Sequence, residues 1–136
     1  METSNAPVLH FSDLPLAPTI LHQLDRLKFV KPTPIQGQSI PLAIEGKDLI
    51  GIAQTGTGKT LAFGLPLIQR LMQTDGLGTA LILLPTRELA FQVQESLQPF
   101  ATALGMRTAL LIGGAAISMQ IQALRQKPRI LIATPG

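Results

Sequence analysis

From Asp48 onward, short apolar runs alternate with segments in which apolar residues recur every three or four positions. An apolar run of four to eight residues is typical of a buried strand, whereas the wider spacing is typical of one face of a helix. The predicted strands are Asp48–Ala53, Thr79–Leu84, Arg107–Ile112 and Arg129–Ala133.

Between these runs, three predicted helices each place their apolar residues on one face. Their apolar sets are Leu61, Leu65, Ile68 and Leu71, then Leu89, Val93, Leu97, Phe100 and Leu104, and finally Ile117, Ile121 and Leu124. Strands that are apolar throughout and alternate with amphipathic helices indicate a parallel sheet with helices on both faces. The predicted fold class is therefore α/β.

Prolines mark further helix starts and expected irregularities. Pro18 precedes an apolar helical pattern, and Thr33 with Pro34 offers an N-cap followed by proline at the first helical position. Two helices are thus expected ahead of the sheet. Pro66 and Pro99 fall inside helical patterns, where each removes a hydrogen bond, so kinks or early helix ends are expected there.

Composition narrows the range of possible functions. The chain has 136 residues, and 46% of them are hydrophobic. This length and hydrophobic content allow one domain, or part of one, and the chain is too short for two domains. It contains no cysteine and only two histidines, which excludes disulfides and thiolate metal sites and argues against an all-histidine zinc site. The net charge of +3 favours an anionic partner only weakly.

The segment Met1–Phe11 lacks the basic start and apolar run of a secretory signal. No apolar stretch approaches the roughly 18 residues of a membrane span. The expected location is the cytoplasm, with no membrane partner.

The segment Ala53–Thr60 reads Ala-Gln-Thr-Gly-Thr-Gly-Lys-Thr and lies between a predicted strand and a predicted helix. A triphosphate needs converging backbone N–H donors, glycines where a Cβ would clash, and the positive end of a helix. In the general phosphate-loop motif, Lys59 reaches the β- and γ-phosphates and Thr60 offers its hydroxyl to Mg²⁺. Lys59 and Thr60 are thus the candidate catalytic residues, and Thr60 the candidate metal ligand. The candidate nucleotide-binding residues of the loop are Thr55, Gly56, Thr57, Gly58, Lys59 and Thr60. The alternative is a glycine-rich turn that only joins strand to helix.

Upstream, Phe29–Gln36 reads Phe-Val-Lys-Pro-Thr-Pro-Ile-Gln. Without context it could be only a capped helix start with Ile35 in the core. It resembles the Q motif of DEAD-box RNA helicases, in which the glutamine contacts adenine and the aromatic residue stacks on the base. The resemblance implies these roles for Gln36 and Phe29, with Phe11 as the upstream aromatic. An amide with one donor and one acceptor suits the N6 and N7 atoms of adenine. The chain departs from the family at Lys28, where glycine is usual.

Three further segments resemble the nucleic-acid-contacting motifs of the same family, and each follows a predicted strand. They supply the candidate RNA contacts Pro85, Thr86, Arg87, Gly113, Gly114, Thr134, Pro135 and Gly136. Taken singly, they could be a helix start capped by Thr86, a flexible loop and a strand-ending turn. In open parallel sheets, ligands collect beyond the carboxyl ends of strands, where backbone groups can hold phosphates without reading base sequence.

Together, these segments resemble the N-terminal part of a RecA-like helicase domain, with a Q-motif region at 11–36 and a phosphate-loop core at 48–136. The resemblance implies ATP and Mg²⁺ as cofactors, RNA as substrate and an ATP-dependent RNA helicase activity. The family's Asp-Glu-Ala-Asp motif, Ser-Ala-Thr motif and second RecA-like domain do not occur in these residues. The domain is thus expected to be incomplete, with exposed sheet edges, and the chain alone is expected to be inactive.

Two alternatives remain open at this point. One is a nucleotide-dependent RNA-binding module that never hydrolyses ATP. The other is a different P-loop enzyme, such as a small-molecule kinase, in which the segment around Gln36 is only structural. Preference for ATP over GTP distinguishes the helicase from the kinase.

Overall fold

The computed structural model describes residues 10–136, so most of the Met1–Phe11 segment considered for a secretory signal lies outside the described residues. The chain divides into two compact units, the first ending at Pro66 and the second spanning Leu67–Gly136. Helix α3 (Lys59–Met72) crosses this boundary. No helix within the described range is both long and apolar enough to span a bilayer.

The first unit contains a short 3₁₀ helix η1 (Phe11–Asp13), α1 (Pro18–Arg26), α2 (Pro34–Ile44) and the first half of α3. Both predicted helix starts are confirmed, because Pro18 and Pro34 occupy the first helical positions and Thr33 is the N-cap of α2. Proline is tolerated there because the missing N–H would have no partner inside the helix. Phe11, Ile20, Leu24 and Ile40 are buried.

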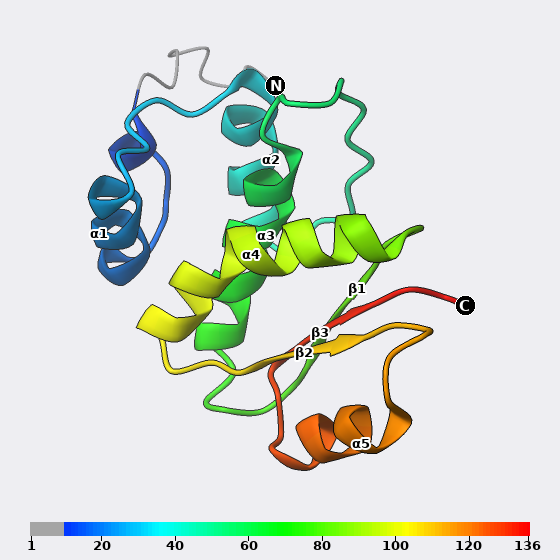
Figure 1. The fold of residues 1–136 in the computed structure, drawn as a ribbon. Coiled ribbons are helices and arrows are strands. Elements are labelled where there is room, and N and C mark those ends of the chain that lie inside the picture. The colour runs from blue at the N-terminus through cyan, green and yellow to red at the C-terminus, as the bar shows by residue number, and fades with distance from the viewer. Residues whose placement is uncertain (1–9) are drawn as a thin grey trace. The chain divides into compact units, whose positions relative to one another are not determined.

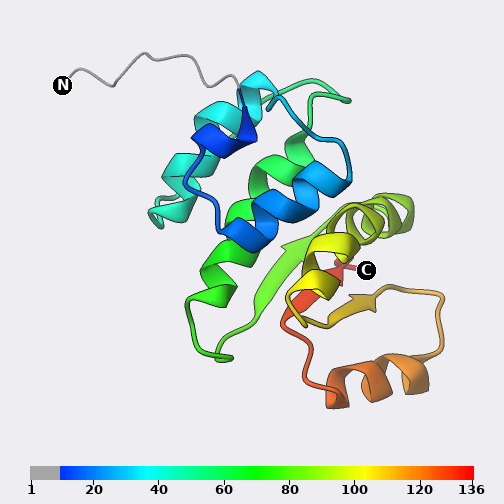
Figure 2. The same cartoon turned by 90° about the vertical axis from the view of Figure 1, so that its left-hand side faces the viewer.

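The second unit is built on three parallel strands, β1 (Ala80–Leu83), β2 (Thr108–Leu111) and β3 (Ile130–Ala133), in the order β1-β3-β2. Helix α4 (Arg87–Ala103) follows β1, and α5 (Ile117–Arg125) follows β2. The two helices lie on opposite faces of the sheet (Figure 1, Figure 2). The predicted α/β class, with a parallel sheet covered by helices on both faces, is confirmed.

The core of the second unit lies between the sheet and α4. Thr108 hydrogen-bonds Gln94 and Gln98 of α4, so its side of the sheet faces this helix. Ile130 and Ile132 share this face, because Thr108 pairs with Ile130 and successive side chains alternate between faces. Of the predicted apolar face of α4, Val93, Leu97 and Phe100 are buried, whereas Leu89 is 40% exposed.

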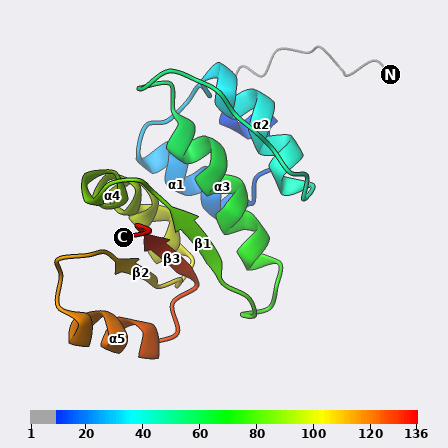
Figure 3. The ribbon, with the colours of Figure 1, turned by 90° about the vertical axis from the view of Figure 1, so that its right-hand side faces the viewer.

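The opposite face is covered less completely, as Figure 3 shows. Helix α5 packs on β2, which leaves Leu81 and Leu83 of β1 more than half exposed. The predicted α5 exists, but its apolar residues Ile117, Ile121 and Leu124 are all exposed. In the described part of the chain, β1 and β2 are edge strands, in agreement with the expected exposed edges.

The strand predicted at Asp48–Ala53 is wrong for this structure, because these residues are neither strand nor helix. Ile50 and Ile52 are 93% and 92% exposed. An apolar run becomes a strand only when a neighbouring strand pairs with its N–H and C=O groups. None of the three strands in residues 10–136 does so. Kinks or early helix ends were expected at Pro66 and Pro99. The helices do not end early, because α3 and α4 continue through both prolines, and the kinks stay a prediction.

The loop between α3 and β1 is held by Arg129, which lies one residue before β3. Its Nε donates to the Gly78 carbonyl over 2.8 Å, and its Nη2 donates to the carbonyls of Leu71 and Leu77, each over 2.9 Å. The Thr74 hydroxyl accepts a further bond from Nη2 over 2.7 Å. The planar fork of one guanidinium therefore joins the end of α3 to the start of β3.

Candidate nucleotide and nucleic-acid sites

The predicted phosphate loop is a turn immediately before α3. Gly56 and Gly58 have φ angles of +82° and +84°, which L side chains rarely adopt. Thr57, between them, donates from its hydroxyl to the Gln54 carbonyl over 2.6 Å. No atom lies within 4 Å of the place where a Cβ on Gly56 would stand, so the loop is open there. Alternating backbone conformations of this kind present N–H groups to an anion.

Helix α3 begins at Lys59, and the Gly58 carbonyl accepts a bond from the Ala62 N–H over 3.2 Å. The first N–H groups of a helix have no partner inside it and carry the positive end of the helix dipole. Lys59 is exposed, and Thr60 is half-buried at the second helical position. Loop, helix end and lysine cation together fit a phosphate group.

Gln36 of α2 is bound directly to this loop. Its side chain is only 3% exposed, its Nε2 donates to the Gly58 carbonyl over 3.1 Å, and its Oε1 accepts from the Thr33 N–H over 2.8 Å. An amide has two N–H donors and two lone pairs on oxygen. One donor and one acceptor of the amide are thus unused, while the bond to Gly58 holds the loop to α2.

Two polar side chains next to Gln36 were not predicted as site residues. Ser39 donates from its hydroxyl to the Ile35 carbonyl over 2.7 Å and to the Ala62 carbonyl over 3.3 Å. The hydroxyl oxygen of Thr33 is buried and has no hydrogen-bond partner. The sequence marked Thr33 only as a helix cap. Its hydroxyl lies close to Gly58, which is 25 residues further along the chain, so the sequence gives no sign of this contact.

The two predicted aromatic residues are in different environments. Phe11 is 3% exposed, and its N–H donates to the Val30 carbonyl over 3.1 Å. Phe29 is 45% exposed, which leaves its ring free to stack. Both line a cavity of about 180 Å³. Lys28 has a φ of +63°, which explains physically why glycine suits this position.

The structure brings the predicted nucleic-acid contacts together at the carboxyl ends of the strands. A surface hollow of about 550 Å³ is lined by Pro85, Thr86, Arg87, Glu88, Gly113, Gly114, Thr134 and Gly136. Only Pro135 of the predicted set is not among these residues, and Glu88 was not predicted. The glutamate lies in the first turn of α4, where the helix dipole stabilises a negative charge.

Arg87 joins two of these segments. Its Nη1 lies 3.5 Å from the Gly113 carbonyl oxygen, and a Cβ on Gly114 would come within 2.7 Å of the same nitrogen. The Thr86 hydroxyl accepts from the Leu89 N–H over 3.2 Å and caps α4, which is the alternative that the sequence left open for this segment. Since Arg87 is exposed and has no ion pair within residues 10–136, its charge is available to an anion.

A metal ion would find few protein ligands in the described part of the chain. No group of three or more His, Asp or Glu side chains there could hold one. Thr60 remains the one candidate ligand that the sequence identified. Mg²⁺ commonly retains several waters and binds through substrate phosphates, so a single hydroxyl is compatible with it.

Known proteins of one family are similar to this chain. The sequence model of the DEAD/DEAH box helicase family matches residues 33–136. ATP-dependent rRNA helicase RRP3 of Yarrowia lipolytica is 48% identical over 126 residues, which cover 93% of this chain and 26% of that protein. The Debaryomyces hansenii protein of the same name is 46% identical over 126 residues, with the same two shares.

A solved structure is also similar. The RNA helicase Prp28 from Chaetomium thermophilum, bound to ADP, matches with a TM-score of 0.81 and 41% identity, covering 89% of this chain and 31% of that one. The chain thus spans about a quarter of the length of the curated relatives that it matches.

Proposed function

The chain belongs to the DEAD/DEAH box helicase family, and from this premise we propose that it forms the ATP-binding part of an ATP-dependent RNA helicase. The observation that carries the proposal is the bond between Gln36 Nε2 and the Gly58 carbonyl. It joins the residue expected to recognise adenine to the loop expected to hold the phosphates. A turn that merely connected two elements would not need this contact.

In the proposed site, Gly56 and Gly58 let the backbone approach the phosphates, and Lys59 supplies a cation to the β- and γ-phosphates. Thr60 would give one oxygen to Mg²⁺, which neutralises charge on the phosphates when bound. Phe29 stacks on adenine and Gln36 bonds its edge. Thr55 and Thr57 flank Gly56 and complete the loop. The backbone N–H of Phe11 bonds the Val30 carbonyl and so supports the segment that contains Phe29.

RNA is proposed to bind along the hollow around Arg87, Gly113 and Thr134, with Pro135 at its border. Backbone N–H groups and one arginine can hold phosphates without selecting a base sequence. Two of the similar proteins are an rRNA helicase and an RNA helicase, which favours RNA as the polymer.

Several groups that the proposed activity needs are absent from these 136 residues, among them the acidic Asp-Glu-Ala-Asp motif. We propose that the hydrolytic carboxylates and a second RecA-like domain complete the enzyme, and that the chain alone binds nucleotide without hydrolysing it. A nucleotide-dependent RNA-binding module is the alternative that remains, whereas family membership argues against a small-molecule kinase. We propose that the protein works in the cytoplasm, the location expected from the sequence.

Replacing Gln36 with alanine is expected to weaken ATP binding more than tripolyphosphate binding, by about 1–3 kcal/mol, because only ATP loses the bidentate base contact. Any loss common to both ligands measures how far the bond to Gly58 supports the loop. Calorimetric titration of the 136-residue chain with each ligand measures both quantities. Equal losses would show that Gln36 holds the loop and does not recognise adenine.

Replacing Arg87 with alanine is expected to weaken binding of single-stranded RNA equally for different sequences. It should also lower the slope of log affinity against log salt by about 1, because one phosphate contact is lost. Titrations of oligouridylate and oligoadenylate at several salt concentrations measure both effects. Arg70→Ala is the matched control, since Arg70 is also exposed but does not line the hollow. An unchanged slope in Arg87→Ala would remove Arg87 from the RNA path.

A further inference from the structure

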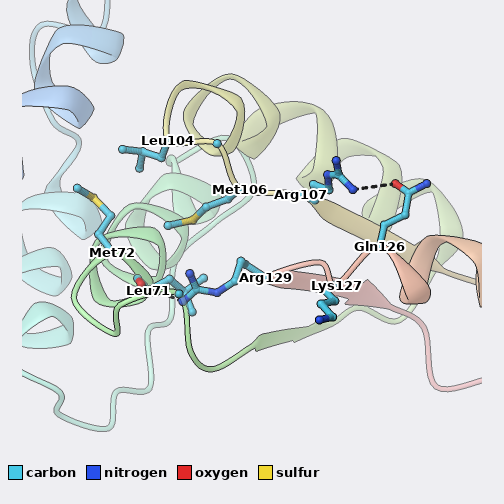
Figure 4. Close-up of a pocket in the computed structure, with 10 residues that line it drawn as sticks. Leu71, Met72, Leu104, Met106, Arg107, Gln126, Lys127 and Arg129 are labelled. Atoms are coloured by element: carbon cyan, nitrogen blue, oxygen red, sulfur yellow. Dashed lines mark hydrogen bonds between the residues drawn. The ribbon is translucent and has the colours of Figure 1, made fainter.

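A further cavity lies at the opposite edge of the sheet from the proposed RNA site, where the strands begin. It has a volume of about 500 Å³ and is formed by the end of α3, the turn after α4 and the turn after α5 (Figure 4). Arg107 and Arg129, which line it, immediately precede β2 and β3, whereas Gly113 and Thr134 of the proposed RNA site follow these strands. Four strand residues, or about 13 Å, separate the two edges.

The cavity is basic and contains no compensating acid. Arg107, Lys127 and Arg129 line it, and no carboxylate does. The one ion pair found within residues 10–136 joins Lys47 to Glu45, so none of the three cations is neutralised by an acidic side chain. Arg129 is bonded to carbonyls, and Arg107 Nη1 lies 3.4 Å from Gln126 Oε1. These partners are neutral groups, so they do not cancel the positive charge of the residues that line the cavity.

Lys127 occupies a backbone position that does not suit a side chain. It follows the C-cap Gln126 of α5 and has a φ of +56°, in the region where glycine or asparagine normally ends a helix. A lysine here is strained relative to glycine. Backbone strain of this kind is often found at functional positions.

One part of the cavity wall is apolar. Leu71 and Met106 are each 7% exposed, and Met72 and Leu104 are half-buried beside them. Methionine side chains are flexible and adapt to varied apolar groups, as they do at protein surfaces that bind several partners. A ligand that uses this wall therefore carries an apolar group together with its negative charges.

No aromatic side chain is among the residues that line this cavity. Single-stranded nucleic acids are usually held by base stacking on aromatic rings as well as by cations, so RNA would use only part of the site. We propose that the cavity binds a short acidic peptide segment of a protein partner. One apolar side chain of that segment rests on Met106, and its flanking carboxylates face Arg107, Lys127 and Arg129.

The test uses the full 136-residue chain and a fluorescent peptide with a central leucine flanked on each side by three acidic residues. Binding is followed by fluorescence anisotropy. Lys127→Gly is expected to weaken binding about fivefold, the effect of one partly exposed charge pair. It is also expected to leave the thermal midpoint unchanged or higher, because glycine relieves the strain. A loss of affinity therefore does not come from unfolding.

Lys28→Gly is the matched control. Lys28 follows the C-cap of α1, has a φ of +63° and does not line the cavity. The Lys28→Gly substitution therefore removes the same charge from the same backbone geometry at a different place. It should change the affinity by less than about twofold, the loss expected of a distant surface charge. Peptides with serine in place of leucine, or with amides in place of the acids, should both bind more weakly.

Three outcomes would overturn the proposal. The first is no binding of the acidic peptide, and the second is an equal loss in Lys28→Gly. The third combines two results: oligouridylate displaces the peptide, and Lys127→Gly weakens oligouridylate binding more than peptide binding. These results together would make the cavity an RNA site. Arg87→Ala should leave peptide binding intact, which separates failure of this proposal from failure of the RNA path.

Discussion

Replacing Lys59 with alanine is expected to lower ATP turnover by about 100- to 1,000-fold in a protein that joins this segment to the family's acidic motif and second domain. Lys59 is the first residue of α3, is exposed, and has no ion pair within residues 10–136. Its cation is therefore free to meet the phosphates beside the helix N-terminus. Steady-state phosphate release with saturating RNA measures the effect.

Lys47→Ala is the control for this measurement. Lys47 is also an exposed lysine, but it lies outside the loop and pairs with Glu45 over 3.2 Å. Exposed ion pairs of this kind contribute little to stability, so its loss should leave turnover nearly unchanged. Near-normal turnover in Lys59→Ala would refute the assignment of the phosphate loop.

Replacing Gly58 with alanine is expected to destabilise the chain by about 2–4 kcal/mol, through backbone strain of roughly 1–2 kcal/mol and the loss of one or two hydrogen bonds. Gly58 has a φ of +84°, and a Cβ there would lie 2.3 Å from Gln36 Nε2 and 3.1 Å from the Thr33 hydroxyl. The Gln36 amide is buried and bonded at both ends, so it cannot move without breaking these bonds. Urea denaturation of the 136-residue chain measures the change.

Gly56→Ala separates the two contributions. Gly56 has nearly the same φ, +82°, but nothing lies within 4 Å of its Cβ position. This variant should therefore show only the strain of roughly 1–2 kcal/mol. If both variants lost the same stability, the contact between Gln36 and Gly58 would not be important for the fold.

Much of the local structure follows from the sequence alone. Pro18, Pro34 and Thr86 mark helix starts that the structure confirms, and three of the four predicted strands exist. Helix capping and proline geometry depend on atoms within a few residues, so a short segment contains the whole signal. The loop glycines were identified from a short motif in which a Cβ would clash with a phosphate, and the structure adds that both have a positive φ.

The tertiary structure decided what depends on partners distant in the sequence. The apolar run at 48–53 has the composition of a strand, but strand formation requires a paired neighbour, and Ile50 and Ile52 remain exposed. Gln36 could be identified as a helix residue, but its bonds to Thr33 and Gly58 depend on how α2 and the loop meet. The basic cavity around Lys127 gave no signal in the sequence. Its cations and apolar wall come from three separate turns, and only the parallel order of the strands brings these turns to one edge.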